Sequence, residues 1–189
     1  MKLSEYVINN NLVFNNTKYD PHPYITEYYD NVFNNLTHQN IKLLEIGIRS
    51  GISLLMWSGW FTKGEIYGLD IDQYIPSNSN IHFTKIDAYT DFALDLYEND
   101  TFDFIIDDGP HTPETQKYVI QHWFKKLKSG GKLIIEDIGC KDENDNKLSP
   151  EESLDFLVQS VDENISDYKV FDLREKGQYD SIILEITKK

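Results

Sequence analysis

The sequence predicts an α/β domain with a mostly parallel, seven-stranded sheet, helices on both faces and an antiparallel hairpin at the C-terminal end. Three observations predict it. Short apolar runs alternate with helical patterns, which is typical of the repeated β–α units of a parallel sheet. These runs are nearly continuous, as strands covered on both faces require. The last two expected strands, residues 168–173 and 181–186, are joined by a link too short for a parallel crossover, so they must be antiparallel.

The other elements follow from local patterns. Residues 24–36 carry aromatic and apolar side chains at helical spacing, which predicts a helix near the N-terminus. A helix over residues 113–127 is expected to end at Lys-Ser-Gly-Gly, because glycines often follow a helix C-terminus. The remaining expected strands are 41–46, 65–69, 81–86, 102–106 and 132–135, the remaining helices are 52–61, 90–98 and 150–161, and the polar stretch 141–146 is an expected loop.

Length and composition narrow the class of protein. The 189 residues suit a single domain, with an N-terminal helical lid or extension over residues 1–39 and an α/β core over residues 40–189. The net charge of −14 disfavours a nucleic-acid partner, since binding to phosphate backbones depends on basic contacts. A single cysteine excludes an internal disulfide, and we see neither a signal peptide nor a bilayer-spanning apolar run. We therefore expect a soluble, cytoplasmic protein without a membrane partner.

Carboxylates follow two of the expected strands. Within residues 103–111, an apolar run ends in Asp107 and Asp108, and His111 follows after Gly-Pro. The run over residues 132–135 ends in Glu-Asp. In an open α/β sheet, ligands bind in the crevice outside the strand ends. The sequence therefore predicts a site for a hard metal ion with a proton acceptor beside it.

A strand-turn-helix segment predicts a cofactor site. Residues 43–53 carry two glycines four positions apart, where Gly47 allows a sharp turn and Gly51 opens the next helix. This loop has fewer glycines than a pyrophosphate-binding loop. It is sufficient for S-adenosylmethionine (SAM), which has no phosphates. Glu45 is placed to orient the loop backbone, and Ser53 to reach the amino-acid end of the ligand.

The next two strands end in acids that suit the rest of such a ligand. Asp70, about 20 residues beyond the glycines, is placed to accept hydrogen bonds from ribose hydroxyls. Asp87 ends the third strand and is placed to bind the adenine amine. Asp72 and Ala88 lie beside these acids in sequence and are predicted to belong to the same cofactor site.

The motifs over residues 17–138 together resemble class I SAM-dependent methyltransferases, and more narrowly the macrocin and mycinamicin O-methyltransferase-like group. They are Leu-Glu-Ile-Gly-x-x-x-Gly-x-Ser-Leu, Tyr-Gly-Leu-Asp-Ile-Asp, Ile-Ile-Asp-Asp-Gly-x-His and Gly-Gly-x-x-x-Ile-Glu-Asp. The resemblance implies a Rossmann-like class I methyltransferase fold. It also implies residue roles: Asp108, Glu136 and Asp137 as metal ligands, His111 as general base, and Ser53, Asp70, Asp87 and Asp108 as cofactor contacts.

The function that this resemblance implies is O-methylation of a sugar or another small polyhydroxylated molecule, including a sugar nucleotide. Mg²⁺ is favoured over zinc because the implied ligands are all oxygens. Under this hypothesis, neighbouring substrate hydroxyls bind the metal and His111 removes the proton before methyl transfer. The resemblance does not identify the molecule that accepts the methyl group, because no large substrate-recognition domain is evident. A homo-oligomer is compatible with the sequence.

Two departures from the group and three alternatives accompany this interpretation. Pro110 stands where the group commonly has serine, and residues 17–24 match its N-terminal Thr-Asp-Lys…His-x-Tyr pattern only loosely, so no role is assigned to His22 or Tyr24. A nicotinamide-dependent Rossmann oxidoreductase would also use a glycine turn and a ribose-binding acid. A non-catalytic SAM-binding module is the second alternative. A different reaction on the same metal site is the third, since a fold does not determine chemistry.

Overall fold

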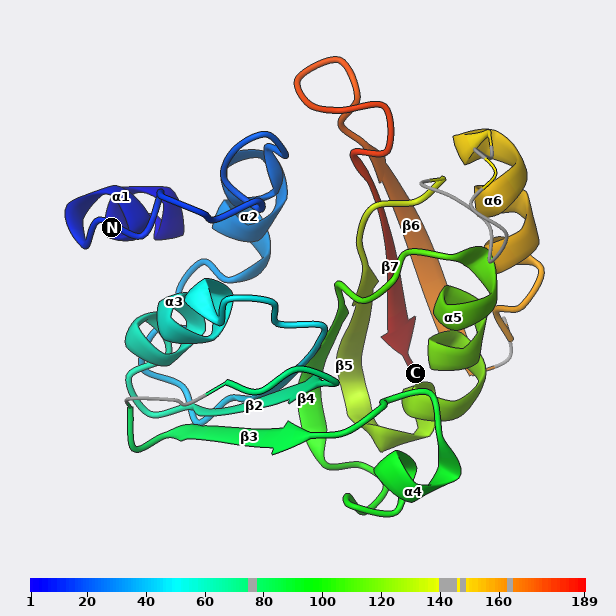
Figure 1. Cartoon of the computed structure of the whole chain (residues 1–189), viewed down its shortest axis with the longest axis horizontal. Coiled ribbons are helices and arrows are strands. Elements are labelled where there is room, and N and C mark those ends of the chain that lie inside the picture. The colour runs from blue at the N-terminus through cyan, green and yellow to red at the C-terminus, as the bar shows by residue number, and fades with distance from the viewer. Residues whose placement is uncertain (75–77, 140–145, 147–148, 163–164) are drawn as a thin grey trace.

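The computed structural model describes residues 1–74, 78–139, 146, 149–162 and 165–189. Seven strands form one sheet in the order β3-β2-β1-β4-β5-β7-β6 (Figure 1). Their bounds are β1 Lys42–Ile46, β2 Glu65–Asp70, β3 Ile81–Lys85, β4 Phe102–Asp107, β5 Leu127–Ile135, β6 Ser166–Asp172 and β7 Ile182–Lys188. β1 to β5 are parallel, and β7 runs antiparallel to both β5 and β6. The predicted fold class is confirmed.

Helices cover both faces of the sheet. One group shares a single apolar cluster and comprises α1 (Leu3–Asn9), a π-helix (Ile25–Tyr29), α2 (Asp30–Val32) and α3 (Ile52–Trp60). The other group comprises α4 (Asp91–Leu94), α5 (Pro113–Tyr118) and α6 (Pro150–Val158). Successive strand residues point to opposite faces, so Leu43 joins the apolar cluster under the first group and Leu44 joins the cluster under the second. The two clusters fix the sheet between its helical layers.

The structure differs from the predicted elements in the helix before β5. α5 continues as a π-helical turn, Val119–Trp123, and a short 3-10 turn, Phe124–Lys126. β5 then begins at Leu127, so Lys-Ser-Gly-Gly lies within the strand and not after the helix. The register between β4 and β5 shifts here, and Gly130 adopts a φ of +78°. Glycine permits such an irregular turn without a steric penalty, which is why the same residues resemble a helix stop in the sequence.

Two further expectations concern single segments. The N-terminal helix ends at Val32, short of Leu36. Most of the expected loop over residues 141–146 lies outside the described residues. None of the helices in the described part of the chain combines the length and apolar character that a membrane span needs.

Candidate functional site

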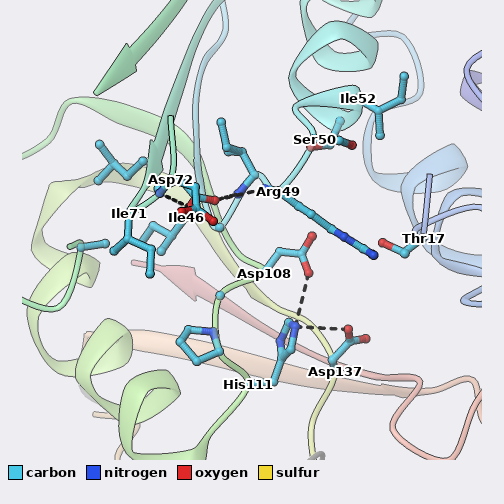
Figure 2. Close-up of a pocket in the computed structure, with 18 of the residues that line it drawn as sticks. Thr17, Ile46, Arg49, Ser50, Ile52, Ile71, Asp72, Asp108, His111 and Asp137 are labelled. Carbon is cyan, nitrogen blue, oxygen red and sulfur yellow. Dashed lines mark hydrogen bonds and ion pairs between the residues drawn. The ribbon is translucent and has the colours of Figure 1, made fainter. Parts of the chain in front are cut away.

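A cavity of about 680 Å³ opens at the carboxyl ends of the central strands (Figure 2). Its volume lies within the range of small-molecule and cofactor sites, about 300–1,000 Å³. Most of the predicted site residues line it: Gly47, Ser53, Asp70, Asp72, Asp87, Ala88, Asp108, His111 and Asp137. The N-terminal extension forms another part of its wall, through residues 15–18 and His22. Glu45, Gly51 and Glu136 are not among the lining residues.

The loop after β1 is held by close backbone packing and by one carboxylate. Gly47 has a φ of +81°, and a Cβ built on it would lie 2.2 Å from the carbonyl oxygen of Asp108. Oδ2 of Asp70 accepts hydrogen bonds from the backbone N–H groups of Ile48 and Arg49, at 2.8 and 3.0 Å. Oδ1 of Asp70 accepts one from the N–H of Asp72 at 2.9 Å. Asp70 thus ties the loop to the end of β2, and its remaining lone pairs can still accept from a ligand.

Replacing Gly47 with alanine is expected to lower the free energy of unfolding by about 2–5 kcal/mol, because a left-handed φ costs about 1–2 kcal/mol and overpacking about 1–3 kcal/mol. Gly130→Ala is the matched control. Gly130 has a similar φ of +78°, but nothing lies within 4 Å of its added Cβ, so only the backbone cost applies. Urea unfolding of both variants measures the difference. Equal destabilisation would show that the contact with Asp108 does not constrain the loop.

The other predicted cofactor residues are distributed along the cavity. Ser53 is buried in the first turn of α3, after Gly51, whose φ is +73°. Asp87 accepts a hydrogen bond from the N–H of Tyr89 at 2.9 Å, and Ala88 is buried beside it. Figure 2 shows the side chain of Arg49 extended across the cavity toward Thr17. The ligand contacts expected of these residues stay predictions.

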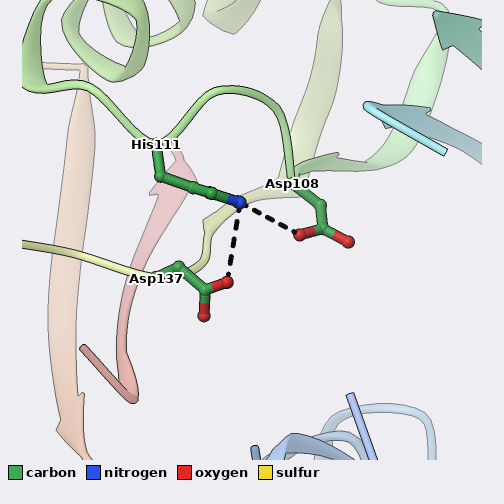
Figure 3. A group of neighbouring side chains, drawn as sticks. All are labelled: Asp108, His111 and Asp137. Atoms are coloured by element: carbon green, nitrogen blue, oxygen red, sulfur yellow. Dashed lines mark ion pairs between the residues drawn. The ribbon is translucent and has the colours of Figure 1, made fainter. Parts of the chain in front are cut away.

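Asp108, His111 and Asp137 come together at the ends of β4 and β5 (Figure 3). Nε2 of His111 lies 3.7 Å from Oδ1 of Asp108 and 3.6 Å from Oδ2 of Asp137. One ligand atom from each of the three side chains lies within 4.8 Å of the other two. His111 and Asp137 have φ values of 60° and 56°, a left-handed conformation that costs energy and is concentrated at functional sites. Both side chains point toward the same place (Figure 3).

Glu136 has a different orientation from its neighbour Asp137. Its side chain is 1% exposed, and its carboxylate accepts hydrogen bonds from the hydroxyl of Tyr29 and from the ammonium of Lys18. Its backbone carbonyl accepts a further bond from the amide of Gln116 at 2.9 Å. Glu136 therefore lies behind the acidic group at the cavity, facing the N-terminal extension, and its role as a metal ligand stays a prediction.

Lys18 is a site residue to which the sequence alone assigned no role. Its Nζ lies 2.6 Å from Oδ2 of Asp108 and 3.2 Å from Oε1 of Glu45, and it also pairs with Glu136. Burial by itself would lower the pKa of Lys18, but the carboxylates of Asp108, Glu136 and Glu45 raise that pKa well above its usual value. The only sequence signal was the position of Lys18 inside the loosely matching stretch over residues 17–24.

The same stretch supports Asp137. Tyr24 donates a hydrogen bond from its hydroxyl to Oδ1 of Asp137. Nδ1 of His22 lies 3.5 Å from the same oxygen and 2.9 Å from the hydroxyl oxygen of Ser181. Two residues to which the resemblance gave no role therefore hold a predicted metal ligand. The N-terminal extension forms one side of the site.

Asp107 is buried and is not among the residues that line the cavity. Its Oδ1 accepts a hydrogen bond from the hydroxyl of Tyr89 at 3.2 Å, and burial raises the pKa of its carboxyl group to about 6. Adjacent residues at a strand end point in opposite directions, which separates Asp107 from Asp108.

The comparisons with known proteins agree with this arrangement. A family model described as a methyltransferase domain matches residues 44–138, which is just over half of the chain. The chain belongs to this methyltransferase family. The match includes the glycine loop, the acids after β2 and β3, and the cluster of Asp108, His111 and Asp137. It favours a methyltransferase over the oxidoreductase alternative.

Curated relatives cover part of this methyltransferase domain. A tetracenomycin rhamnosyl 3'-O-methyltransferase of Streptomyces olivaceus is 32% identical over 130 residues, covering 61% of this chain and 32% of the relative. Mycinamicin VI 2''-O-methyltransferase of Micromonospora griseorubida is 32% identical over 125 residues, covering 61% and 31%. The chain thus aligns with about a third of the length of these relatives.

A solved structure extends the likeness to the whole chain. The MycE methyltransferase of mycinamycin biosynthesis, in complex with Mg, SAH and mycinamycin VI, superposes with a TM-score of 0.76 at 25% identity. The superposition covers all of this chain and 54% of that one. The fold of this methyltransferase domain is therefore that of about half of the longer MycE chain.

The donor groups at the site fit a divalent cation. The ammonium of Lys18 contacts three carboxylates, those of Glu45, Asp108 and Glu136, and the carboxylate of Asp137 lies close enough to Asp108 and Glu136 for their charges to interact. Burial raises the pKa of Asp137, and the charge of Asp108 adds to the rise. Buried like charges are costly unless compensated, and hard divalent ions prefer oxygen ligands. Asp108 and Asp137 present oxygens to the same point and would hold such an ion.

Proposed function

We propose that this domain is a SAM-dependent, Mg²⁺-dependent O-methyltransferase that acts on a hydroxyl of a sugar or another small polyhydroxylated molecule, including a sugar nucleotide. One observation carries the proposal. Nε2 of His111 lies between the carboxylates of Asp108 and Asp137, on the wall of the cavity that the glycine loop also lines. A proton acceptor, a metal-binding pair and a cofactor loop thus face one space.

The cofactor half of the proposal rests on the loop and the strand-end acids. Gly47 and Ser53 would contact the methionine portion of SAM, and Asp70 with Asp72 the ribose. Asp87 and Ala88 would contact the adenine. All six residues line the cavity, and they come from the ends of three successive strands, β1, β2 and β3, and the connections that follow them. Glu45 and Gly51 would act indirectly, by holding the loop.

The chemical half rests on activation of a poor nucleophile. A sugar hydroxyl has a pKa far above 7, so its proton must be removed as the oxygen attacks. His111 is a suitable base because neutral imidazole accepts protons near neutral pH. A bound Mg²⁺ supplies a Lewis acid that lowers the pKa of a coordinated hydroxyl. Asp108 and Asp137 would hold this ion, with Glu136 as the third predicted ligand.

The relatives support the substrate class. Their names describe methylation of the 3'-hydroxyl of a rhamnosyl group and the 2''-hydroxyl of mycinamicin VI. The MycE structure contains Mg and SAH together with mycinamycin VI. We propose for this chain only the features that these proteins share, which are a sugar hydroxyl as the methylated group and a bound metal. We do not propose a particular acceptor molecule. We also propose that residues 1–39 and 40–189 act as one domain, within an assembly that can be homo-oligomeric.

Ligand titration followed by thermal unfolding tests the cofactor. SAM at about 100 times its Kd is expected to raise Tm by about 5–10 °C, and NAD at the same concentration is expected to leave Tm unchanged. A shift with NAD and none with SAM would reject the proposal. A methyl-transfer assay on nucleotide sugars then separates an enzyme from a non-catalytic SAM-binding module, which would give the Tm shift without product.

A further inference from the structure

We propose that Lys18 is the resident cation of the metal-free site: its ammonium neutralises Glu45, Asp108 and Glu136, and it competes with the divalent cation for Asp108 and Glu136. This inference rests on the proposed function, because it concerns the metal that function requires. The side chain of Lys18 is 2% exposed, although lysine is rarely buried without a partner. A charged group that is buried away from water is costly unless opposite charges lie close to it.

The ammonium joins three separate strand ends. Glu45 belongs to β1, Asp108 follows β4 and Glu136 follows β5, whereas Lys18 comes from the N-terminal extension. Nζ forms hydrogen bonds with Asp108 and Glu136 and an ion pair with Glu45. A lysine ammonium has three donors and no acceptor, so three carboxylates match its capacity. Lys18 thereby connects the cofactor loop to the metal side of the site.

The distribution of oxygens explains why Lys18 competes with a metal. Oδ2 of Asp108 faces Lys18, while Oδ1 of Asp108 faces His111. The two oxygens of Glu136 are both taken by the N-terminal extension, one by Lys18 and one by Tyr29. Oxygens that accept hydrogen bonds from an ammonium are less available to a dication. The ammonium also repels a second cation placed a few ångströms away.

Two opposite consequences follow from removing this charge. Without Lys18, the buried carboxylates lose their compensation, so the metal-free protein becomes less stable. The same carboxylates then bind a dication more tightly, because the competitor and its repulsion are gone. A residue that only filled space or only braced the carboxylates would produce the first effect without the second.

Lys18→Met tests this with isothermal titration of Mg²⁺ and with Tm measured in EDTA and in saturating Mg²⁺. We expect Tm in EDTA to fall, the rise in Tm on adding Mg²⁺ to exceed that of the wild type, and the Kd for Mg²⁺ to fall by about tenfold or more. An unchanged or higher Kd for Mg²⁺ would overturn the proposal. Both readouts are independent of methyl transfer.

Lys132→Met is the matched control. Lys132 pairs with Glu185, another buried carboxylate, but neither residue lines the cavity. Its removal is expected to lower Tm in EDTA and in Mg²⁺ by the same amount, with the Kd for Mg²⁺ unchanged. If Lys132→Met also tightened Mg²⁺ binding, the effect would come from net charge and not from Lys18, and the proposal would fail.

The double variant Lys18→Met with Glu45→Gln keeps the net charge of the wild type and provides the same measurement if the single variant does not fold. It leaves Asp108, Glu136 and Asp137 intact, so tighter Mg²⁺ binding than in the wild type is again expected. Wild-type protein that Mg²⁺ does not stabilise would count against the metal in the proposed function. A wild type that binds Mg²⁺, with variants that bind it no better, would reject only the role of Lys18.

Discussion

Replacing His111 with asparagine is expected to lower the rate of methyl transfer by about 10²–10⁴-fold while leaving SAM binding unchanged, because general-base assistance has about this value. Asparagine removes the imidazole but tolerates a left-handed backbone better than most residues. This matters because His111 has a φ of 60°. Single-turnover methyl transfer and calorimetric titration with SAM measure the two quantities separately.

His38→Asn is the control for this experiment. His38 pairs with the hydroxyl of Thr62 at 3.0 Å, in an exposed position away from the cavity lining. The control variant is expected to keep wild-type turnover. Near-normal turnover of His111→Asn would reject His111 as the base, and loss of SAM binding would assign it a structural role instead.

The sheet could be predicted because its strands are short, apolar and covered on both sides. Phe104, Ile105 and Ile106 illustrate this: consecutive residues of β4 pack into opposite clusters, so a continuous apolar run marks the strand. The start of β5 could not be predicted in the same way. Gly130 adopts a positive φ where the pairing of β5 with β4 is irregular. The local sequence does not distinguish a glycine in such a strand from a glycine that ends a helix.

The sequence predicted those site residues that lie directly after a strand. β4 and β5 are parallel neighbours, so Asp108 and Asp137 end at the same edge of the sheet. Side-chain direction within a pair of adjacent acids is a different matter. Glu136 turns toward Tyr29 and Lys18, and Asp137 turns toward the cavity, because their surroundings offer different partners.

The contacts of Lys18 could not be predicted from the sequence. Its partner Asp108 is 90 residues away along the chain, and Glu136 is 118 residues away. No local pattern encodes such a contact, which exists only once the N-terminal extension packs over the strand ends. The extension therefore has a larger share in the site than its loose motif indicates.

Removal of divalent cations is expected to have the other large effect on activity. EDTA should lower methyl transfer by about 100-fold or more, since Lewis-acid activation contributes several kcal/mol to such a reaction. Added Mg²⁺ should restore the rate. Undiminished activity in EDTA would remove the metal from the proposed function and leave His111 as the sole activating group.

Asp108→Asn is expected to reproduce the effect of EDTA without recovery in Mg²⁺, because the amide keeps the shape of the side chain but loses the charge that holds a dication. Asp103→Asn, on β4, the strand that Asp108 follows, is the matched control. Asp103 pairs with Lys128 at 2.8 Å and is not among the residues that line the cavity. The control should retain both activity and Mg²⁺-dependent stabilisation. If Asp108→Asn responded to Mg²⁺ as the wild type does, the ion would bind elsewhere. The proposed metal site at Asp108 and Asp137 would then be rejected.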